Sequence, residues 1–261
     1  MNDLKSYYEI FKEHEGLVSQ RWSHYFFIYD LILQKFREKR EPVNLLEIGV
    51  QNGGSLEIWK KYMPEGSQIY GIDINEKCCD LKFSDNIHFY LGDASNTNFT
   101  DEALENIRFD IILDDGSHQS QEVINSFIFL FPKLNSGGVY IIEDLEHSYW
   151  KKSGGGFRKK NSSIEFFKKI IDSLNFDYIN MGKIEFFFNK KELNFLRKYS
   201  GYINNISFYP NICSINKYSI AKNEPFQCVK TGQIEEVIRL SWRKTINDLQ
   251  HLIDLNKSMF E

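Results

Sequence analysis

The segment from Phe109 to Trp150 constrains the fold of this chain more than any other. Its sequence, FDIILDDGSHQSQEVINSFIFLFPKLNSGGVYIIEDLEHSYW, holds two apolar strand patterns, FDIIL and VYII, separated by a helical segment. Such patterns are typical of neighbouring parallel strands, which lie about 4.8 Å apart. The pairs Asp114-Asp115 and Glu143-Asp144 end the two strands. We therefore expect these carboxylates side by side at the carboxyl ends of a parallel sheet, where open α/β sheets bind ligands.

Neither carboxylate motif contains an arginine or lysine. Carboxylates gathered without a counter-charge repel one another, so the pattern predicts a divalent cation at this edge of the sheet. Strand alternation turns Asp114 away from the side of Asp115, and Asp114 is therefore interpreted as a structural residue. Glu143-Asp144 as a plain solvated pair at a strand end is the alternative.

The remaining patterns repeat the alternation of strand and helix. Strands are predicted at 43–49, 68–74 and 86–94, and helices at 3–15, 22–39, 55–63 and 121–134, the last closed by Pro132 and a turn at 135–138. This order predicts a doubly wound, Rossmann-like α/β sheet that is mostly parallel. Later strands at 183–189 and 205–217 favour an antiparallel edge hairpin, after a helix at 163–175.

The chain is expected to form a single domain over residues 1–261. Residues 1–40 would be a helical cover, 43–220 the α/β core and 233–260 a long amphipathic helix that packs on its own sheet or on another subunit, so a homo-oligomer stays open. A net charge of −4 gives no hint of a nucleic-acid or anionic-membrane partner. No apolar run approaches the roughly 20 residues that span a bilayer. The N-terminal residues lack a signal-peptide pattern and the four cysteines form no CxxC pair, which favours a cytoplasmic protein with reduced thiols.

The turn after the first strand, EIGVQNGGS from Glu47 to Ser55, opens a helix. Glycines allow a tight turn and close backbone approach, and a helix N-terminus favours negative charge. The dinucleotide pattern GxGxxG is absent, which disfavours a nicotinamide dehydrogenase. Asp73 ends the second strand, where an acidic residue can bind ribose hydroxyls, and Asp93 ends the third. Together these strand ends favour a nucleoside cofactor over a purely structural turn.

These motifs, EIGxxxGGS, GIDI, GDAS, DDGSH and IIEDL, resemble those of class I S-adenosylmethionine-dependent methyltransferases. More narrowly, they are similar to the metal-dependent sugar O-methyltransferases of the mycinamicin and macrocin type, a signature shared by cephalosporin-hydroxylase-like proteins. The resemblance covers roughly residues 20–220. The DDGSH and IEDLxxSYW portions are the specific ones, whereas the glycine turn is generic.

The resemblance implies a role for each motif residue. The methionine part of S-adenosyl-L-methionine would lie against Glu47, Gly49, Gly53 and Ser55, its ribose against Asp73 and its adenine near Asp93. Mg²⁺ would be held by Asp115, Glu143 and Asp144, and His118 would be the general base. The residues themselves agree, because Mg²⁺ prefers oxygen ligands, vicinal sugar hydroxyls can chelate it, and a histidine accepts a proton near neutral pH.

Several alternatives stay open. His118 can instead cap the helix that follows it, and His147 is interpreted as a loop histidine. His24, Tyr25 and Tyr29 belong to a helix over the cofactor pocket, where core packing is as good an interpretation as ligand contact. The basic loop 148–163 is either a substrate lid, with Tyr149 and Trp150 stacked on a sugar, or a solvated loop.

The expected function is a Mg²⁺-dependent sugar O-methyltransferase of surface-polysaccharide or natural-product glycan biosynthesis, with a small-molecule or nucleotide-linked sugar as acceptor. The alternatives are a non-sugar vicinal diol as acceptor and a non-catalytic nucleoside-binding module.

Overall fold

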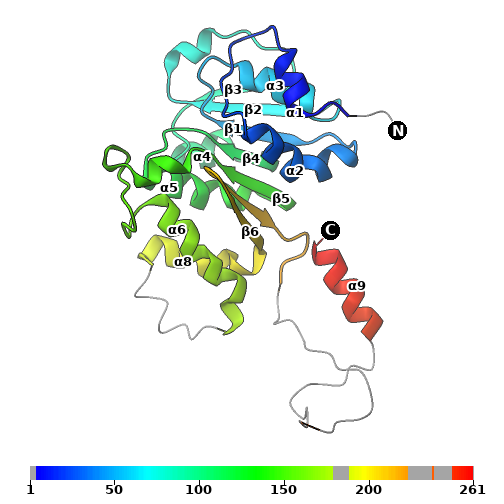
Figure 1. Ribbon diagram of the computed structural model, residues 1–261, viewed down its shortest axis with the longest axis vertical. Helices are drawn as coiled ribbons and strands as arrows, with labels where there is room; N and C mark the ends of the chain where they lie inside the picture. Colours follow the sequence, from blue (N-terminus) through cyan, green and yellow to red (C-terminus); the bar gives the residue numbers. More distant parts are fainter. Residues whose placement is uncertain (1–3, 179–187, 223–236, 238–248, 261) are drawn as a thin grey trace.

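A seven-stranded sheet forms the centre of the protein, in the order β3-β2-β1-β4-β5-β7-β6 (Figure 1). The computed structural model describes residues 4–178, 188–222, 237 and 249–260. The strands are β1 (Asn44–Ile48), β2 (Gln68–Asp73), β3 (Ile87–Leu91), β4 (Phe109–Asp114), β5 (Leu134–Ile142), β6 (Ile203–Tyr209) and β7 (Ile212–Lys217). β1 to β5 run parallel, and β7 pairs antiparallel with both β5 and β6. The predicted parallel sheet with an antiparallel edge hairpin is confirmed. The hairpin lies within residues 203–217, however, where the sequence predicts one strand, because the chain turns at Pro210 and Asn211.

Helices cover both faces of the sheet (Figure 1). One face packs against α1 (Tyr7–Lys12), α2 (Tyr25–Glu38) and α3 (Gly54–Tyr62). The other packs against α5 (Ser120–Leu130), α6 (Ser163–Ile170) and α8 (Lys190–Tyr199), with α4 (Thr97–Ala103) nearby. Apolar residues alternate along each strand, so that Leu45 joins one core and Leu46 the other, and burial of this apolar surface is the main favourable contribution to folding. The last described helix is α9 (Leu249–Phe260).

Short 3-10 segments connect several of these elements. They lie at Glu76–Asp80, Phe131–Lys133, Leu145–Tyr149, Lys151–Ser153, Ile171–Tyr178 and Ser200–Tyr202. The predicted helix 163–175 therefore ends as an α-helix at Ile170 and continues as a 3-10 segment.

The sheet register places the two acidic strand ends together. Asp114 is the register partner of Ile48 on β1 and of Ile142 on β5. Beyond the strands, Glu143 N donates to Asp114 O at 2.9 Å and Asp115 N donates to Ile48 O at 3.0 Å. Asp115 and Glu143 thus leave adjacent parallel strands at the same edge, as the sequence predicts.

Two local predictions are wrong. The helix predicted to Leu134 ends at Leu130, because a short 3-10 turn containing Pro132 follows it. The residues predicted as a turn, 135–138, lie inside β5, where the pairing with β4 shifts register between Phe109 and Ile111. Helix α4 has no counterpart in the sequence prediction; its N-cap Asn96 accepts from the backbone of Asn98.

Some predictions fall on parts of the chain that the structure does not describe. The strand at 183–189 is described only from residue 188, and the helix at 233–260 only at residue 237 and over α9. Within the described ranges, no helix is long and apolar enough to cross a membrane.

Candidate active site

A cavity of about 570 Å³ opens at the carboxyl ends of β1, β2, β4 and β5. It brings together the turn after β1, the acidic ends of β4 and β5, and the segment that precedes α2. Gly49, Ser55, Asp73, Asp115, His118, Glu143 and Asp144 all line it. A larger hollow of about 790 Å³ lies between α1 and the ends of α2 and α3, but none of the predicted site residues lines it.

The turn after β1 is built for close backbone approach. Gly49 has φ +93°, and a Cβ atom there would lie 2.2 Å from the carbonyl oxygen of Asp115. Gly53 has φ +85° and caps α3 without a side-chain hydrogen bond to the first turn. The helix N-terminus therefore keeps backbone N–H groups that can meet a ligand's negative charge.

Asp73 supports this turn from the end of β2. Its Oδ2 accepts from the backbone N–H groups of Val50 at 2.8 Å and Gln51 at 2.9 Å, and its Oδ1 accepts from Asn75 N at 2.8 Å. Asp93 differs, since it is exposed after β3, accepts from Ser95 N at 2.8 Å and is not among the residues lining the cavity. The structure thus places Asp73 at the cavity wall and Asp93 outside it.

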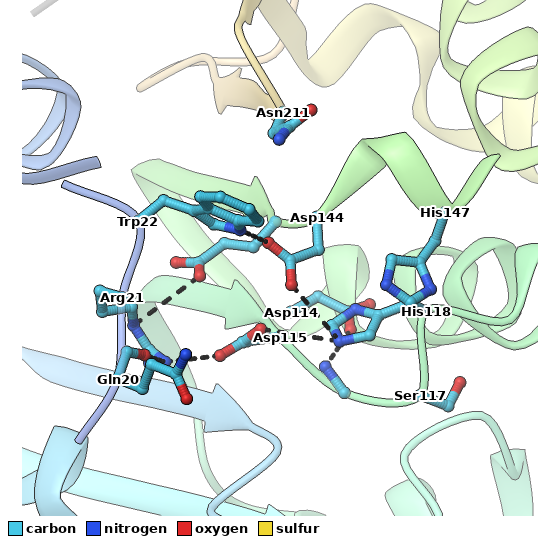
Figure 2. Close-up of polar contacts among 12 residues, drawn as sticks. Gln20, Arg21, Trp22, Asp114, Asp115, Ser117, His118, Asp144, His147 and Asn211 are labelled. Carbon is cyan, nitrogen blue, oxygen red and sulfur yellow. Dashed lines mark hydrogen bonds and ion pairs between the residues drawn. The ribbon is translucent and has the colours of Figure 1, made fainter. Parts of the chain in front are cut away.

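Arg21, which no sequence motif includes, reaches the carboxylate cluster from the segment before α2 (Figure 2). Its Nη1 donates to Asp115 Oδ2 at 2.7 Å, and its Nη2 donates to Glu47 Oε1. Its Nε lies 3.8 Å from Glu143 Oε2. The expectation of carboxylates without a basic partner considered only the motifs and needs correction, because Arg21 supplies one positive charge from a distant segment. Three carboxylates still face one guanidinium.

Burial sets the protonation of these carboxyl groups. It raises the pKa of Glu47 to about 7, although Arg21 and the Ser55 hydroxyl, which donates to Glu47 Oε2 at 2.6 Å, both lower it. It raises the pKa of Asp115 to about 6 against the opposing effect of Arg21, while Asp144 adds to the increase. Burial also raises the pKa of Glu143 well above its usual range. The pKa values of these three carboxyl groups rise because burial disfavours their charged forms and the single guanidinium of Arg21 compensates only in part.

Glu143 and Asp144 take their orientation from α2. Tyr29 donates its hydroxyl hydrogen to Glu143 Oε1. Asp144 Oδ1 accepts from the Tyr25 hydroxyl at 2.7 Å. It also accepts from Trp22 Nε1 at 3.1 Å (Figure 2). Two donors on Oδ1 leave Oδ2 directed at His118 Nε2, 3.7 Å away. Core packing was at least as good an interpretation as ligand contact for Tyr25 and Tyr29. Both are buried, and their hydroxyl groups donate to Asp144 and Glu143.

His118 lies between the two acidic strand ends. Its Nε2 is 3.7 Å from Asp144 Oδ2 and 3.9 Å from Asp115 Oδ1. The backbone of His118 is left-handed, with φ +54°, and Asp144 is too, with φ +52°. Non-glycine residues in this conformation are uncommon and cluster at functional sites. The cap of α5 is Gln119, so the alternative role of His118 as the helix cap is wrong. Burial lowers the pKa of His118 below its usual value, which favours the neutral imidazole.

His147 approaches His118 from the 3-10 segment after β5 (Figure 2). The two ring centroids are 4.6 Å apart, and the ring centroid of Trp150 lies 4.3 Å from that of His147. His147 Nδ1 is 3.2 Å from the Ser153 hydroxyl. The interpretation of His147 as a loop histidine misses this position beside the predicted base.

Asp114 points away from the cavity. It is 3% exposed and its Oδ2 accepts from the Tyr140 hydroxyl on β5 at 3.2 Å. Burial raises the pKa of Asp114 to about 7. The structure therefore agrees with the interpretation of Asp114 as a structural residue.

Comparison with known proteins supports the resemblance that the motifs carry. Residues 46–145 match a family described as "Methyltransferase domain". The chain is 35% identical over 156 residues to an 8-demethyl-8-alpha-L-rhamnosyl tetracenomycin-C 2'-O-methyltransferase of Streptomyces olivaceus, covering 56% of this chain and 40% of that protein. It is 38% identical over 151 residues to a mycinamicin VI 2''-O-methyltransferase of Micromonospora griseorubida, covering 53% and 37%.

The fold matches a solved methyltransferase. The MycE methyltransferase from the mycinamycin biosynthetic pathway, in complex with Mg, SAH and mycinamycin VI, superposes with a TM-score of 0.67 at 28% identity. The match covers 84% of this chain and 56% of that one. The match spans about two fifths of the length of the two O-methyltransferases from Streptomyces olivaceus and Micromonospora griseorubida. The predicted Rossmann-like methyltransferase fold and the resemblance to sugar O-methyltransferases are confirmed.

Proposed function

We propose that this chain is an S-adenosyl-L-methionine-dependent, Mg²⁺-assisted O-methyltransferase that acts on a sugar hydroxyl of a glycosylated small molecule. One observation carries the proposal: a single cavity of about 570 Å³ joins the glycine turn after β1 to Asp115, His118 and Asp144. A methyl donor and an acceptor hydroxyl must meet within one such space for direct transfer. The acceptor belongs to natural-product or surface-polysaccharide biosynthesis, and either a free or a nucleotide-linked sugar fits the proposal.

The cofactor half of the cavity fits the donor. S-adenosyl-L-methionine would supply an activated methyl group as a sulfonium. Gly49, Gly53 and Ser55 would surround its methionine part beside Glu47, and Asp73 would accept from its ribose hydroxyls. Asp93 is proposed for the adenine end, although it lies outside the cavity residues. The absence of a Cβ atom at Gly49 keeps the turn against the Asp115 backbone, which fixes the floor of this half.

The carboxylate half fits a hard divalent cation. Asp115, Glu143 and Asp144 offer oxygen atoms only, the donor type that Mg²⁺ prefers. Glu47, Asp115 and Glu143 share the one guanidinium of Arg21, and burial raises the pKa of each, so a divalent cation bound there would displace protons from these carboxyl groups. Bound there, Mg²⁺ would lower the pKa of a coordinated sugar hydroxyl. The proposed ligands are these three carboxylates, held in place by Arg21, Tyr29, Tyr25 and Trp22.

His118 is proposed as the general base. Its lowered pKa keeps the imidazole neutral and able to take the hydroxyl proton at neutral pH. Asp144 Oδ2, 3.7 Å from Nε2, would stabilise the imidazolium after the proton arrives. Methyl transfer then depends on holding the acceptor oxygen in line with the donor, which the fixed walls of the cavity favour.

Aromatic rings at the rim suit a sugar acceptor. Trp22 is 52% exposed and Trp150 is 40% exposed, and both line the cavity. Lys152 Nζ lies 4.7 Å from the ring centroid of Trp150. Indole faces offer a large, rigid contact area for a ligand face, with a polar N–H beside it. This favours an acceptor ring that contacts a tryptophan at the rim over a small flexible diol.

The first experiment is calorimetric titration of S-adenosylhomocysteine into the protein, with Mg²⁺ and then with EDTA. We expect binding in both conditions, because the cofactor half does not need the metal. The Asp73→Asn variant should bind more weakly, and the exposed Asp85→Asn variant serves as its matched control. Loss of binding in EDTA would assign the metal to the cofactor pocket instead. No binding in either condition would overturn the proposal.

The second experiment measures methyl transfer to rhamnosylated aglycones, with catechols as non-sugar diols. Transfer to the glycoside alone supports the sugar acceptor. Transfer to the catechol alone identifies the alternative vicinal diol. Binding of S-adenosylhomocysteine without transfer to any acceptor would favour the non-catalytic nucleoside-binding module.

A further inference from the structure

We propose that His118, Asp144 and His147 form a binding site for a borderline transition-metal ion, represented by Zn²⁺, which shares only Asp144 with the proposed Mg²⁺ ligands. One possible ligand atom from each of these residues lies within 4.8 Å of those of the other two. Among the described residues, this is the group of histidine, cysteine, aspartate or glutamate side chains whose ligand atoms come this close together. Two imidazoles and one carboxylate suit Zn²⁺ far better than Mg²⁺, because Mg²⁺ prefers oxygen donors.

The carboxylate ligand is oriented for this role. Asp144 Oδ1 is occupied by the Tyr25 hydroxyl at 2.7 Å and Trp22 Nε1 at 3.1 Å. Oδ2 therefore faces His118 Nε2, 3.7 Å away (Figure 2). Hydrogen bonds that fix a ligating carboxylate in this way are a regular feature of metal sites.

The second histidine is oriented as well. His147 Nδ1 is held 3.2 Å from the Ser153 hydroxyl, which leaves Nε2 as the nitrogen available for a metal. The rings of His118 and His147 lie with their centroids 4.6 Å apart. In metal sites, a ligating histidine almost always uses its other ring nitrogen for such a hydrogen bond.

The backbone supplies an independent sign of function. His118 and Asp144 both have left-handed φ values, +54° and +52°, although neither is a glycine or lies within a helix or strand of the sheet. Strain of this kind persists only where the surrounding structure imposes it, and it clusters at functional sites. Here it brings two of the three proposed ligands to face each other. The three protein ligands leave further coordination positions open to the cavity, the arrangement typical of a reactive or inhibitory zinc site.

The consequence for turnover rests on the proposed function. Zn²⁺ bound through His118 would occupy the nitrogen that is proposed to accept the hydroxyl proton. It would also take Asp144 from the proposed Mg²⁺ set. We therefore expect Zn²⁺ to inhibit methyl transfer measured in excess Mg²⁺, and Zn²⁺ binding itself can be measured without any methyl transfer.

The test is calorimetric titration of Zn²⁺ into the full chain and into the variants His147→Ala, Ser153→Ala and His88→Ala. His147→Ala should weaken Zn²⁺ binding at least tenfold, and Ser153→Ala should weaken it by about 10–100-fold, as loss of an orienting partner does elsewhere. His88 is hydrogen-bonded to Gln68 on β2 and does not line the cavity. His88→Ala should therefore leave Zn²⁺ affinity unchanged. Unchanged Zn²⁺ affinity in His147→Ala would overturn the proposal.

Two further measurements separate the site from its neighbours. Mn²⁺, which prefers carboxylates, should bind His147→Ala as it binds the unchanged protein; an equal loss for both ions would mean damage to the fold and count against the site. In NMR spectra, the imidazole signals of His118 and His147 should move on Zn²⁺ addition while that of His88 stays. Movement of neither signal would overturn the assignment of the ligands, whatever the outcome for methyl transfer.

Discussion

Arg21 Nη1 donates to Oδ2 of Asp115 across 2.7 Å, so a residue in the segment before α2 is bound to the end of β4, 94 positions later. The same guanidinium donates to Glu47 on β1. One side chain therefore links the end of β1, just before the glycine turn, to the acidic end of β4. Arg21 also lines the cavity and places a positive charge beside these carboxyl groups.

Replacing Arg21 by alanine should destabilise the protein in a pH-dependent way. Arg21→Ala leaves the buried Glu47 and Glu143 and the half-buried Asp115 without their counter-charge, and loss of one partner of a buried ion pair typically costs about 3–5 kcal/mol. Without Arg21 the folded-state pKa values of Glu47, Asp115 and Glu143 rise further, because Arg21 lowers each of them. Protonation of these groups in the folded state then offsets the penalty at low pH, so the loss should be larger at pH 8 than at pH 5.5.

Urea unfolding at both pH values measures this effect. The exposed Arg108→Ala variant is the control and should change the free energy of unfolding by less than about 0.5 kcal/mol. If Arg21→Ala loses equal stability at pH 5.5 and pH 8, charge compensation is not what Arg21 contributes. Added Mg²⁺ should stabilise Arg21→Ala more than the unchanged protein, since the freed oxygens can then bind the ion.

The proposed metal ligands can be tested separately from the cofactor pocket. Asp115→Asn and Glu143→Gln keep the side-chain shape but remove the anionic oxygen, and each should abolish methyl transfer while S-adenosylhomocysteine binding changes little. Glu146→Gln is the matched control, because Glu146 lines the same cavity and is not a proposed ligand. Near-normal turnover in either of the first two variants would refute the metal mechanism.

Local sequence patterns were enough to predict the acidic edge and the parallel strands, except for the first residues of β5. The apolar runs that end in Asp114-Asp115 and Glu143-Asp144 occupy adjacent β4 and β5, because short continuous runs separated by a helix leave few other arrangements. The turn that contains Gly49 and Gly53 was also predictable, because glycine readily adopts the left-handed backbone that both residues have.

The residues that surround the motifs were not predictable in this way. Arg21 and Trp22 lie outside every motif and reach their partners across 94 and 122 positions. Periodicity reports only on neighbours within a few residues, so it cannot pair such positions. One signal was present: an acidic cluster at strand ends requires a cation, and Arg21 is a basic residue just before a helix predicted to cover that edge. His147 gave no comparable signal, because its approach to His118 depends on the 3-10 turn after Asp144.

The proposed base sets the acid side of the pH profile. Burial lowers the pKa of His118 below its usual 6.5, and only the neutral imidazole can accept the hydroxyl proton. Above pH 6.5 the protonation of His118 should therefore no longer affect turnover. Turnover should fall as the pH drops through the lowered pKa of His118. His118→Ala should reduce turnover by about 10²–10⁴-fold and remove this limb.

The control for His118 is another histidine near the cavity. His24 Nε2 lies 3.1 Å from the carbonyl oxygen of Pro210, and the His24 ring contacts Tyr25. His24→Ala should retain most of the turnover and the same acid limb. A loss of only a few-fold in His118→Ala, measured under saturating cofactor, would leave His118 a structural role.

Asp114 allows a test of burial that does not depend on catalysis. Burial raises its pKa from 3.8 to about 7, and Tyr140 donates to its Oδ2 at 3.2 Å. Between these two pH values the folded protein holds a proton that the unfolded chain has lost, so this group makes stability fall as the pH rises towards 7.

Asp114→Asn keeps an acceptor for Tyr140 and removes the titration. The free energy of unfolding of Asp114→Asn relative to the unchanged protein should thus increase by about 2–4 kcal/mol between pH 4 and pH 8. Urea unfolding across this range measures it, with exposed Asp85→Asn as the control that stays flat. A pH-independent difference for Asp114→Asn would mean that the carboxyl group is solvated in the folded protein, in conflict with its 3% exposure.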